Sequence, residues 1–150
     1  MTPNELSERL WCFAARVGKV VNALPDTRLG RHVAGQLVRS GTAAAPNYDE
    51  ARAGESRADF AHKVNIALKE LVETRGWLKF LVIAELMPAH RIQAVIEECD
   101  QLCRILGKSV ATAKGKRRPP EPRSAPTPAN NQLPFFNDQF SIKPHFLHMG

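Results

Sequence analysis

Apolar residues recur at helical spacing in four segments of the chain. In the first segment they step by three or four positions from Leu6 to Leu24, which is the period at which side chains share one face of an α-helix. Pro25 is expected to end this helix, because proline cannot continue the helical hydrogen bonding. The apolar stripe consists of Leu6, Leu10, Phe13, Val17, Val20, Val21 and Leu24.

The second helical segment opens after Pro25, where Asp26 or Thr27 is a suitable N-cap. A proline inside a helix removes one hydrogen bond and clashes with the preceding turn. We therefore expect the stretch from Gly41 to Pro46 to kink or break this helix, with residues 47–53 continuing it as a short extra piece. Its apolar positions are Leu29, Val33, Leu37 and Val38.

The third and fourth segments have the longest apolar stripes. Gly54 closes the second segment, and Glu55-Ser56 offers an N-cap for a long third helix. The fourth helix is expected to start at Met87-Pro88, since proline is tolerated in the first turn of a helix. The third stripe is Phe60, Val64, Ala67, Leu71, Thr74, Leu78 and Leu81, and the fourth is Ile92, Val95, Ile96, Cys99, Leu102, Cys103, Leu106 and Val110.

Four amphipathic segments with short connections predict an all-α fold, an antiparallel up-down four-helix bundle with a kinked second helix. We expect this bundle to occupy residues 1–114. Seven of the eleven prolines lie beyond Gly115, and no apolar periodicity continues there. Residues 115–150 are therefore predicted to be a disordered, basic, Pro-rich tail.

The net charge of +6 is unevenly distributed. Residues 1–110 hold 15 Lys and Arg against 13 Asp and Glu, while residues 111–150 hold 6 against 2. The pI near 9.6 therefore overstates how basic the predicted bundle is. A basic balance suits a polyanionic partner such as RNA.

The sequence also bears on where the protein resides. The N-terminus lacks a basic start followed by an apolar stretch, and the longest apolar run, Phe80 to Ala84, is too short to span a bilayer. Three cysteines argue against a secreted disulfide framework. We expect a cytoplasmic protein without membrane association.

None of the residues that could carry chemistry forms a complete catalytic or metal site. Cys99 and Cys103 share a helical face, but two thiols without a nearby His are an incomplete metal site, so buried core thiols are favoured. His32 and His62 fit exposed or capping positions better than a convergent site. The glycines follow no phosphate-loop spacing. We therefore expect no enzymatic activity, cofactor, metal or small-molecule substrate.

Two carboxylates of the predicted third helix could have either a catalytic or a structural role. Glu70 and Glu73 are close enough for acid–base work, but Arg39 on the second helix is available to both. On a helical bundle such carboxylates more often meet an arginine and fix the register of two helices. A structural role is the favoured interpretation.

A binding surface needs no pocket, so basic positions are also candidates. No acid occurs between Asp26 and Asp49, which makes the second helix locally cationic. A solvated helix face and a phosphate-contacting surface both fit this pattern. The candidate nucleic-acid-binding residues are Arg28, Arg31, Arg52, Arg57 and Lys63.

Residues 36–81 carry a family resemblance. The motif positions include the Arg39-Ser40 pair, Asn47-Tyr48, Lys69-Glu70, Glu73-Thr74 and Trp77-Leu78. They resemble a bacterial four-helix bundle family first noticed as proteins encoded in intervening sequences of 23S ribosomal RNA genes. The likeness extends over about residues 5–112; Pro46 and Gly76 depart from the family's usual residues.

The resemblance implies a non-catalytic protein that assembles as a homo-oligomer, since some relatives form homopentameric rings. One related branch, the accessory variability determinant of diversity-generating retroelements, binds nucleic acid and a reverse transcriptase. RNA or a reverse transcriptase is therefore a candidate partner. The alternative is a protein-interaction or structural module without nucleic-acid binding. Arg39, Asn47, Tyr48, Glu70, Glu73 and Trp77 are interpreted as structural, with Trp77 filling the core.

Overall fold

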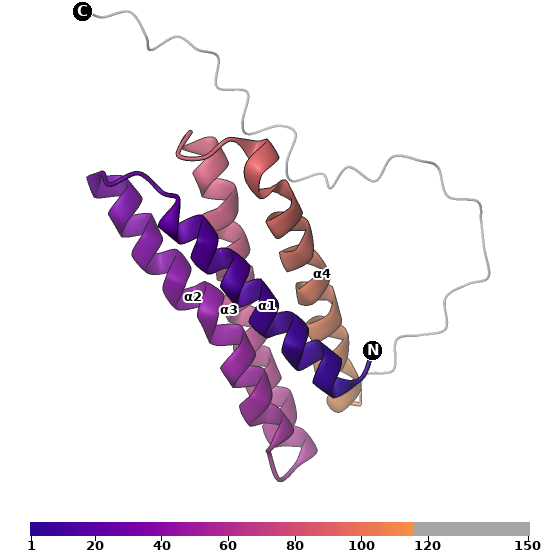
Figure 1. Cartoon of the computed structure of the whole chain (residues 1–150). Coiled ribbons are helices and arrows are strands. Elements are labelled where there is room, and N and C mark those ends of the chain that lie inside the picture. The colour runs from indigo at the N-terminus through magenta and orange to yellow at the C-terminus, as the bar shows by residue number, and fades with distance from the viewer. Residues whose placement is uncertain (116–150) are drawn as a thin grey trace, which may run out of the picture. The chain divides into compact units, whose positions relative to one another are not determined.

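The computed structural model describes residues 1–115, which form four α-helices and no strand. The helices are α1 (Pro3–Asn22), α2 (Arg28–Arg52), α3 (Arg57–Ile83) and α4 (Ala89–Ala113). Each is joined to the next by a short connection, so consecutive helices run antiparallel (Figure 1). The predicted four-helix bundle is confirmed. The tail predicted for residues 115–150 lies outside the described residues, apart from Gly115.

Side-chain caps fix where three of the helices begin. The hydroxyls of Thr2, Thr27 and Ser56 each accept a hydrogen bond from a backbone N–H in the first turn of the helix that follows. Glu5 completes a capping box with Thr2. Pro88 stands at the N-cap of α4 and makes no side-chain cap. The sequence therefore located the starts of α2, α3 and α4 correctly.

The predicted stripes form the core between the helices. The fully buried large side chains include Phe13, Leu37, Leu71, Leu78 and Leu102. Two predicted core positions of α2 are wrong, because Leu29 and Val38 are exposed. They flank the inward-facing stripe of α2 rather than belonging to it, since small residues, among them Ala44 and Ala45, complete that stripe.

The expected break in the second helix did not occur. α2 runs unbroken through Pro46, and residues 47–53 belong to it apart from Ala53, its C-cap. Next to the proline, the Asn47 side chain donates a hydrogen bond to the Ala43 carbonyl at 2.7 Å. Ala44 and Ala45, just before Pro46, are fully buried in the core. Tertiary packing therefore holds the helix together across a residue that would interrupt an isolated one. A bend without a break stays a prediction.

Helices α1 and α2 approach closely at Gly41, and this contact yields a test. A Cβ added there would lie 2.5 Å from Cγ1 of the buried Val17, so the core would have to shift. We expect Gly41→Ala to lower the free energy of unfolding by about 1–2 kcal/mol despite its gain in helix propensity.

The same substitution at Gly76 is the matched control. A Cβ at this position of α3 meets no atom within 4 Å, so Gly76→Ala is expected to raise the free energy of unfolding by up to about 1 kcal/mol. Urea denaturation of both variants measures the two effects. If both variants changed the free energy of unfolding in the same direction, the close approach of α1 and α2 at Gly41 would be contradicted.

Candidate nucleic-acid interface

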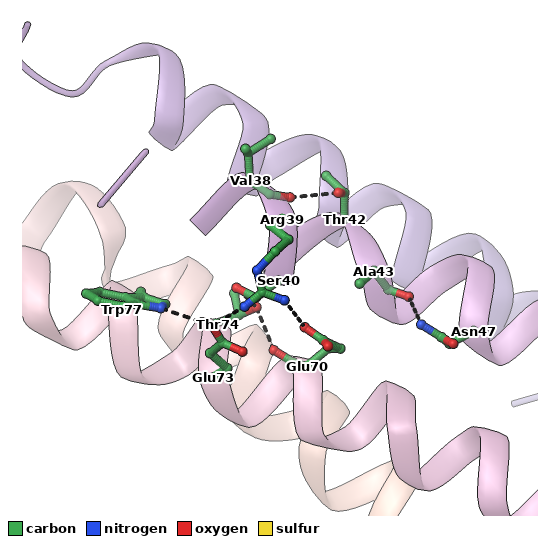
Figure 2. A network of polar contacts seen from close by, with 10 residues as sticks. All are labelled: Val38, Arg39, Ser40, Thr42, Ala43, Asn47, Glu70, Glu73, Thr74 and Trp77. Atoms are coloured by element: carbon green, nitrogen blue, oxygen red, sulfur yellow. Dashed lines mark hydrogen bonds and ion pairs between the residues drawn. The ribbon is translucent and has the colours of Figure 1, made fainter. Parts of the chain in front are cut away.

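Several of the motif residues meet between α2 and α3. The guanidinium of Arg39 contacts Glu70 at 3.3 Å and also pairs with Glu73 (Figure 2). Directly beneath, the hydroxyls of Ser40 and Thr74 are fully buried and hydrogen-bonded at 2.9 Å. The cluster therefore links the two helices at one level.

Trp77 packs against the core from its margin, instead of filling its interior as expected from the sequence. Its side chain is half-buried. Its ring makes edge-on contacts with His32 and Phe80, at centroid distances of 6.0 and 5.7 Å. The indole N–H donates to Glu73 at 3.3 Å (Figure 2). A buried indole would need an acceptor inside the core, whereas here an accessible carboxylate provides one.

The electrostatics of this cluster keep Glu73 ionised. Hydrogen bonds from Arg39, and then from Trp77, hold the pKa of Glu73 below its ordinary value. A general acid or base working near neutral pH needs the opposite shift for a carboxyl group. Tyr48, next to Asn47, is buried, and burial raises its pKa. The motif residues are therefore occupied with one another and with the core.

The five predicted nucleic-acid-binding residues do not form one surface. Arg28 and Arg31 lie in the first turn of α2, while Arg52 ends it and Arg57 and Lys63 begin α3. At about 1.5 Å rise per residue, Arg28 and Arg52 are separated by about 36 Å along α2. The structure places these residues at opposite ends of the bundle.

Four of the five also have partners within the described residues. Arg31 pairs with Asp26 at 2.7 Å, and Lys63 pairs with Asp59 at 3.3 Å. The guanidinium of Arg57 donates to the carbonyl of Thr112 in the last turn of α4, at 3.3 Å. Arg52 pairs with Asp49, so within residues 1–115 Arg28 is the one member of the five whose side chain has neither an ion pair nor a hydrogen bond.

Arg52 belongs to a polar cluster that joins α1 to α2. Asp49 lies 3.6 Å from Arg52 and accepts hydrogen bonds from the Ser7 hydroxyl and the Trp11 indole, at 2.5 and 2.9 Å. The bond from Ser7 is the main cause of the lowered pKa of Asp49. Trp11 nevertheless remains 48% exposed. Sequence reasoning did not reveal this cluster, because Ser7 and Trp11 lie far along the chain from Asp49.

The structure brings other cations together at one end of the bundle. This cationic end comprises residues 16–32 and 79–91, which are the last turns of α1 and α3 and the starts of α2 and α4. It holds six Lys and Arg against two Asp and Glu, whereas the rest of residues 1–115 holds ten against eleven. The six cations are Arg16, Lys19, Arg28, Arg31, Lys79 and Arg91.

Three of these cations line a groove between α1 and α4. Arg16 and Lys19 approach it from α1 and Arg91 from α4, around a hollow of about 350 Å³. The two helices make the fewest contacts of any neighbouring pair and diverge toward this end (Figure 1). Sequence reasoning missed the grouping, because only the up-down topology places the end of α1 beside the start of α4.

Further along the same seam, an ion pair closes the space between α1 and α4. Arg9 donates two hydrogen bonds to the carboxylate of Glu98, at 2.6 and 2.8 Å, and one to Gln101 at 2.7 Å. These bonds are the main cause of the lowered pKa of Glu98, and the charge of Arg16 lowers it further. The groove is therefore bounded at one end by a fixed polar contact.

Within the described residues, no group of three His, Cys, Asp or Glu side chains could hold a metal ion. Cys99 and Cys103 are both buried, and the thiol of Cys99 donates to the Leu71 carbonyl at 3.2 Å. The hydrogen bond with Cys103 and burial both raise the pKa of Cys99, which keeps it a neutral thiol. None of helices α1 to α4 is long and apolar enough to cross a membrane.

Comparison with known proteins agrees with the fold. The family described as 23S rRNA-intervening sequence protein matches residues 6–108. A solved structure of a protein with unknown function from Bacteroides thetaiotaomicron, assigned to the S23 ribosomal protein family, is 30% identical with a TM-score of 0.66. The similarity covers 70% of this chain and 97% of that one. Comparison with curated proteins gives no match. The chain therefore belongs to the 23S rRNA-intervening sequence protein family.

Proposed function

We propose that this protein is a non-catalytic, oligomeric accessory protein that binds the phosphate backbone of nucleic acid, with RNA as its partner. The observation that carries the proposal is the concentration of positive charge at the cationic end, in a bundle whose remainder is slightly acidic. Clustered Lys and Arg release counterions from a phosphate backbone on binding and provide most of non-specific affinity.

The side chains at the cationic end are available for such contacts. Lys19, Arg28 and Arg91 are exposed and make no ion pair within residues 1–115. Helices α2 and α4 also begin here, and their N-terminal N–H groups add positive potential. Since phosphate contacts carry no sequence information, binding should depend little on base sequence.

The proposal that the protein is non-catalytic rests on the ion pairs that its carboxylates already form. Glu70 and Glu73 are engaged by Arg39, and Glu98 by Arg9. The three cysteines among the described residues are free thiols, which suits a reducing compartment, so we place the protein in the cytoplasm.

Oligomerisation is proposed because large apolar side chains remain uncovered on a single chain. Trp11, Val38, Val72 and Ile83 are exposed on α1, α2 and α3. A closed ring such as a pentamer would repeat the cationic end and strengthen weak contacts through avidity. Light scattering at micromolar concentration is expected to report an oligomer, and a monomer would remove this part of the proposal.

Trp11 favours a second candidate function, a protein-interaction module. A half-exposed tryptophan held in place by Asp49 is typical of an interface anchor. A reverse transcriptase, implied by the resemblance to one branch, would be a protein partner of this kind.

Removal of the tail tests the proposal, because the tail carries basic residues of its own. Residues 1–115 and the full chain are compared for binding to a fluorescently labelled RNA at low salt. We expect the shortened chain to retain most of the affinity, since the cationic end is complete in it. Loss of all binding on truncation would assign the activity to residues 116–150 and contradict the proposal.

A further inference from the structure

The groove between α1 and α4 combines two surfaces of different character. Its rim carries the cations Arg16, Lys19 and Arg91, and its floor is formed by the apolar side chains of Val20, Met87 and Val95. These three floor residues are almost fully buried in the bundle, so the floor is a fixed part of the core.

This combination restricts what the groove can bind. A simple anion gains nothing from an apolar floor, and an apolar ligand gains nothing from a rim of unpaired cations. A nucleotide matches both, because its phosphate is anionic while its base has apolar faces. Glu98, further along the α1–α4 seam, is already bonded to Arg9 and interacts with the charge of Arg16. Neither Lys19 nor Arg91 forms an ion pair within residues 1–115. Lys19 and Arg91 therefore keep their full charge for a ligand.

The size of the groove argues against a larger occupant. Its volume of about 350 Å³ is at the lower limit of ligand pockets, which span about 300–1,000 Å³. The contact of Arg9 with Glu98 and Gln101 closes the seam toward the middle of the bundle. A peptide helix lying along the seam would meet this contact, whereas one nucleotide would not.

We infer that the groove binds one unpaired nucleotide of a single-stranded nucleic acid, with its phosphate at Lys19 and Arg91 and its base against Val20, Met87 and Val95. This inference rests on the proposed function and adds a preference for single strands. In a duplex the bases are stacked and paired, so they cannot enter the groove. The higher charge density of a duplex would otherwise favour duplex binding.

The test compares full-length protein binding to oligouridylate and to an RNA duplex of the same length, by fluorescence anisotropy over a range of salt concentrations. The wild type is expected to bind the single strand at least tenfold more tightly. The double variant Lys19→Gln/Arg91→Gln should lower single-strand affinity at least tenfold. Its salt slope should fall by about 0.7, because Lys19 and Arg91 hold one phosphate and each phosphate contact to a single strand contributes about 0.7.

Two further variants distinguish binding in the groove from attraction to the overall positive charge of the cationic end. Arg28→Gln/Arg31→Gln removes the same number of cations outside the groove, and it should lower the affinity for both RNAs by similar factors. Ala94→Leu fills the groove from an exposed position without changing charge. It should reduce single-strand affinity several-fold and leave duplex affinity unchanged.

Three results would overturn the inference. Equal affinity of the wild type for both RNAs would leave the proposed function intact, but it would show that the groove does not bind an unpaired nucleotide. Unchanged single-strand binding by Ala94→Leu, with thermal unfolding like that of the wild type, would do the same. Absence of binding to either RNA at low salt would overturn both the inference and the proposed function.

Discussion

Truncation of Leu71 to Ala is expected to lower the free energy of unfolding by about 2–5 kcal/mol, measured by urea denaturation followed by far-UV circular dichroism. Leu71 lies fully buried in α3, where it belongs to the central hydrophobic core. Its backbone carbonyl also accepts the thiol of Cys99 on α4. Loss of the side chain leaves a cavity at the contact between the two helices, which rigid neighbours fill only partly.

The adjacent residue provides the control. Val72 is 44% exposed, so Val72→Ala should change the free energy of unfolding by less than about 0.5 kcal/mol within a single chain. A comparable loss in the free energy of unfolding for Leu71→Ala and Val72→Ala would contradict the assignment of the core face of α3. Dependence of the Val72→Ala effect on protein concentration would indicate that an oligomer covers this residue.

The second large effect is expected at the cationic end. Replacement of Lys19, Arg28 and Arg91 by Gln should lower RNA affinity by about a hundredfold at low salt, because charge-assisted contacts to phosphate are lost. Gln is nearly as good a helix former as Lys or Arg, so the helices should be retained. Fluorescence anisotropy with labelled RNA measures the loss.

A charge-matched variant controls for the net charge of the protein. Lys69, Arg104 and Lys108 are exposed, lie outside the cationic end, and form no ion pair within residues 1–115. Their replacement by Gln removes the same three charges and should lower the affinity only a few-fold. An equal loss in both triple variants would mean that overall charge, not its location, determines binding.

The fold could be predicted from sequence largely because apolar residues recur at a regular helical period in each of the four helices. The stripes of α3 and α4 are buried almost as expected; only Phe60 is left partly exposed. The caps at Thr27 and Ser56 depend on local chemistry within one turn, which the sequence displays directly. These features need no knowledge of how the helices pack.

Features that depend on packing were less predictable. Pro46 was expected to interrupt α2 when only local preference was considered, but the buried alanines before it and the bond from Asn47 to Ala43 stabilise a continuous helix. Trp77 belongs to the motif, yet its contact with His32 at the core margin follows from where α2 and α3 meet.

The candidate interface was the least predictable part. Arg28 and Arg31 are neighbours in sequence and appeared to be the start of a surface that continued to Lys63. Cations gather in the structure for a different reason, because the chain reverses direction three times and returns Arg91 to the level of Lys19. The ion pairs that occupy Arg31 and Lys63 are local, and the i,i+4 spacing of Asp59 and Lys63 is visible in the sequence, but the prediction of Lys63 as a phosphate contact did not take it into account.

The salt dependence of RNA binding by the wild-type full chain tests the proposed function most directly. Affinity is measured by anisotropy with a single-stranded RNA at increasing salt concentration. Binding through phosphates at the cationic end predicts a steep linear fall of log affinity with log salt, with a slope of about 0.7 for each of several contacts, and little dependence on base sequence. Absence of measurable binding at low salt would contradict the nucleic-acid function and leave the protein-interaction module.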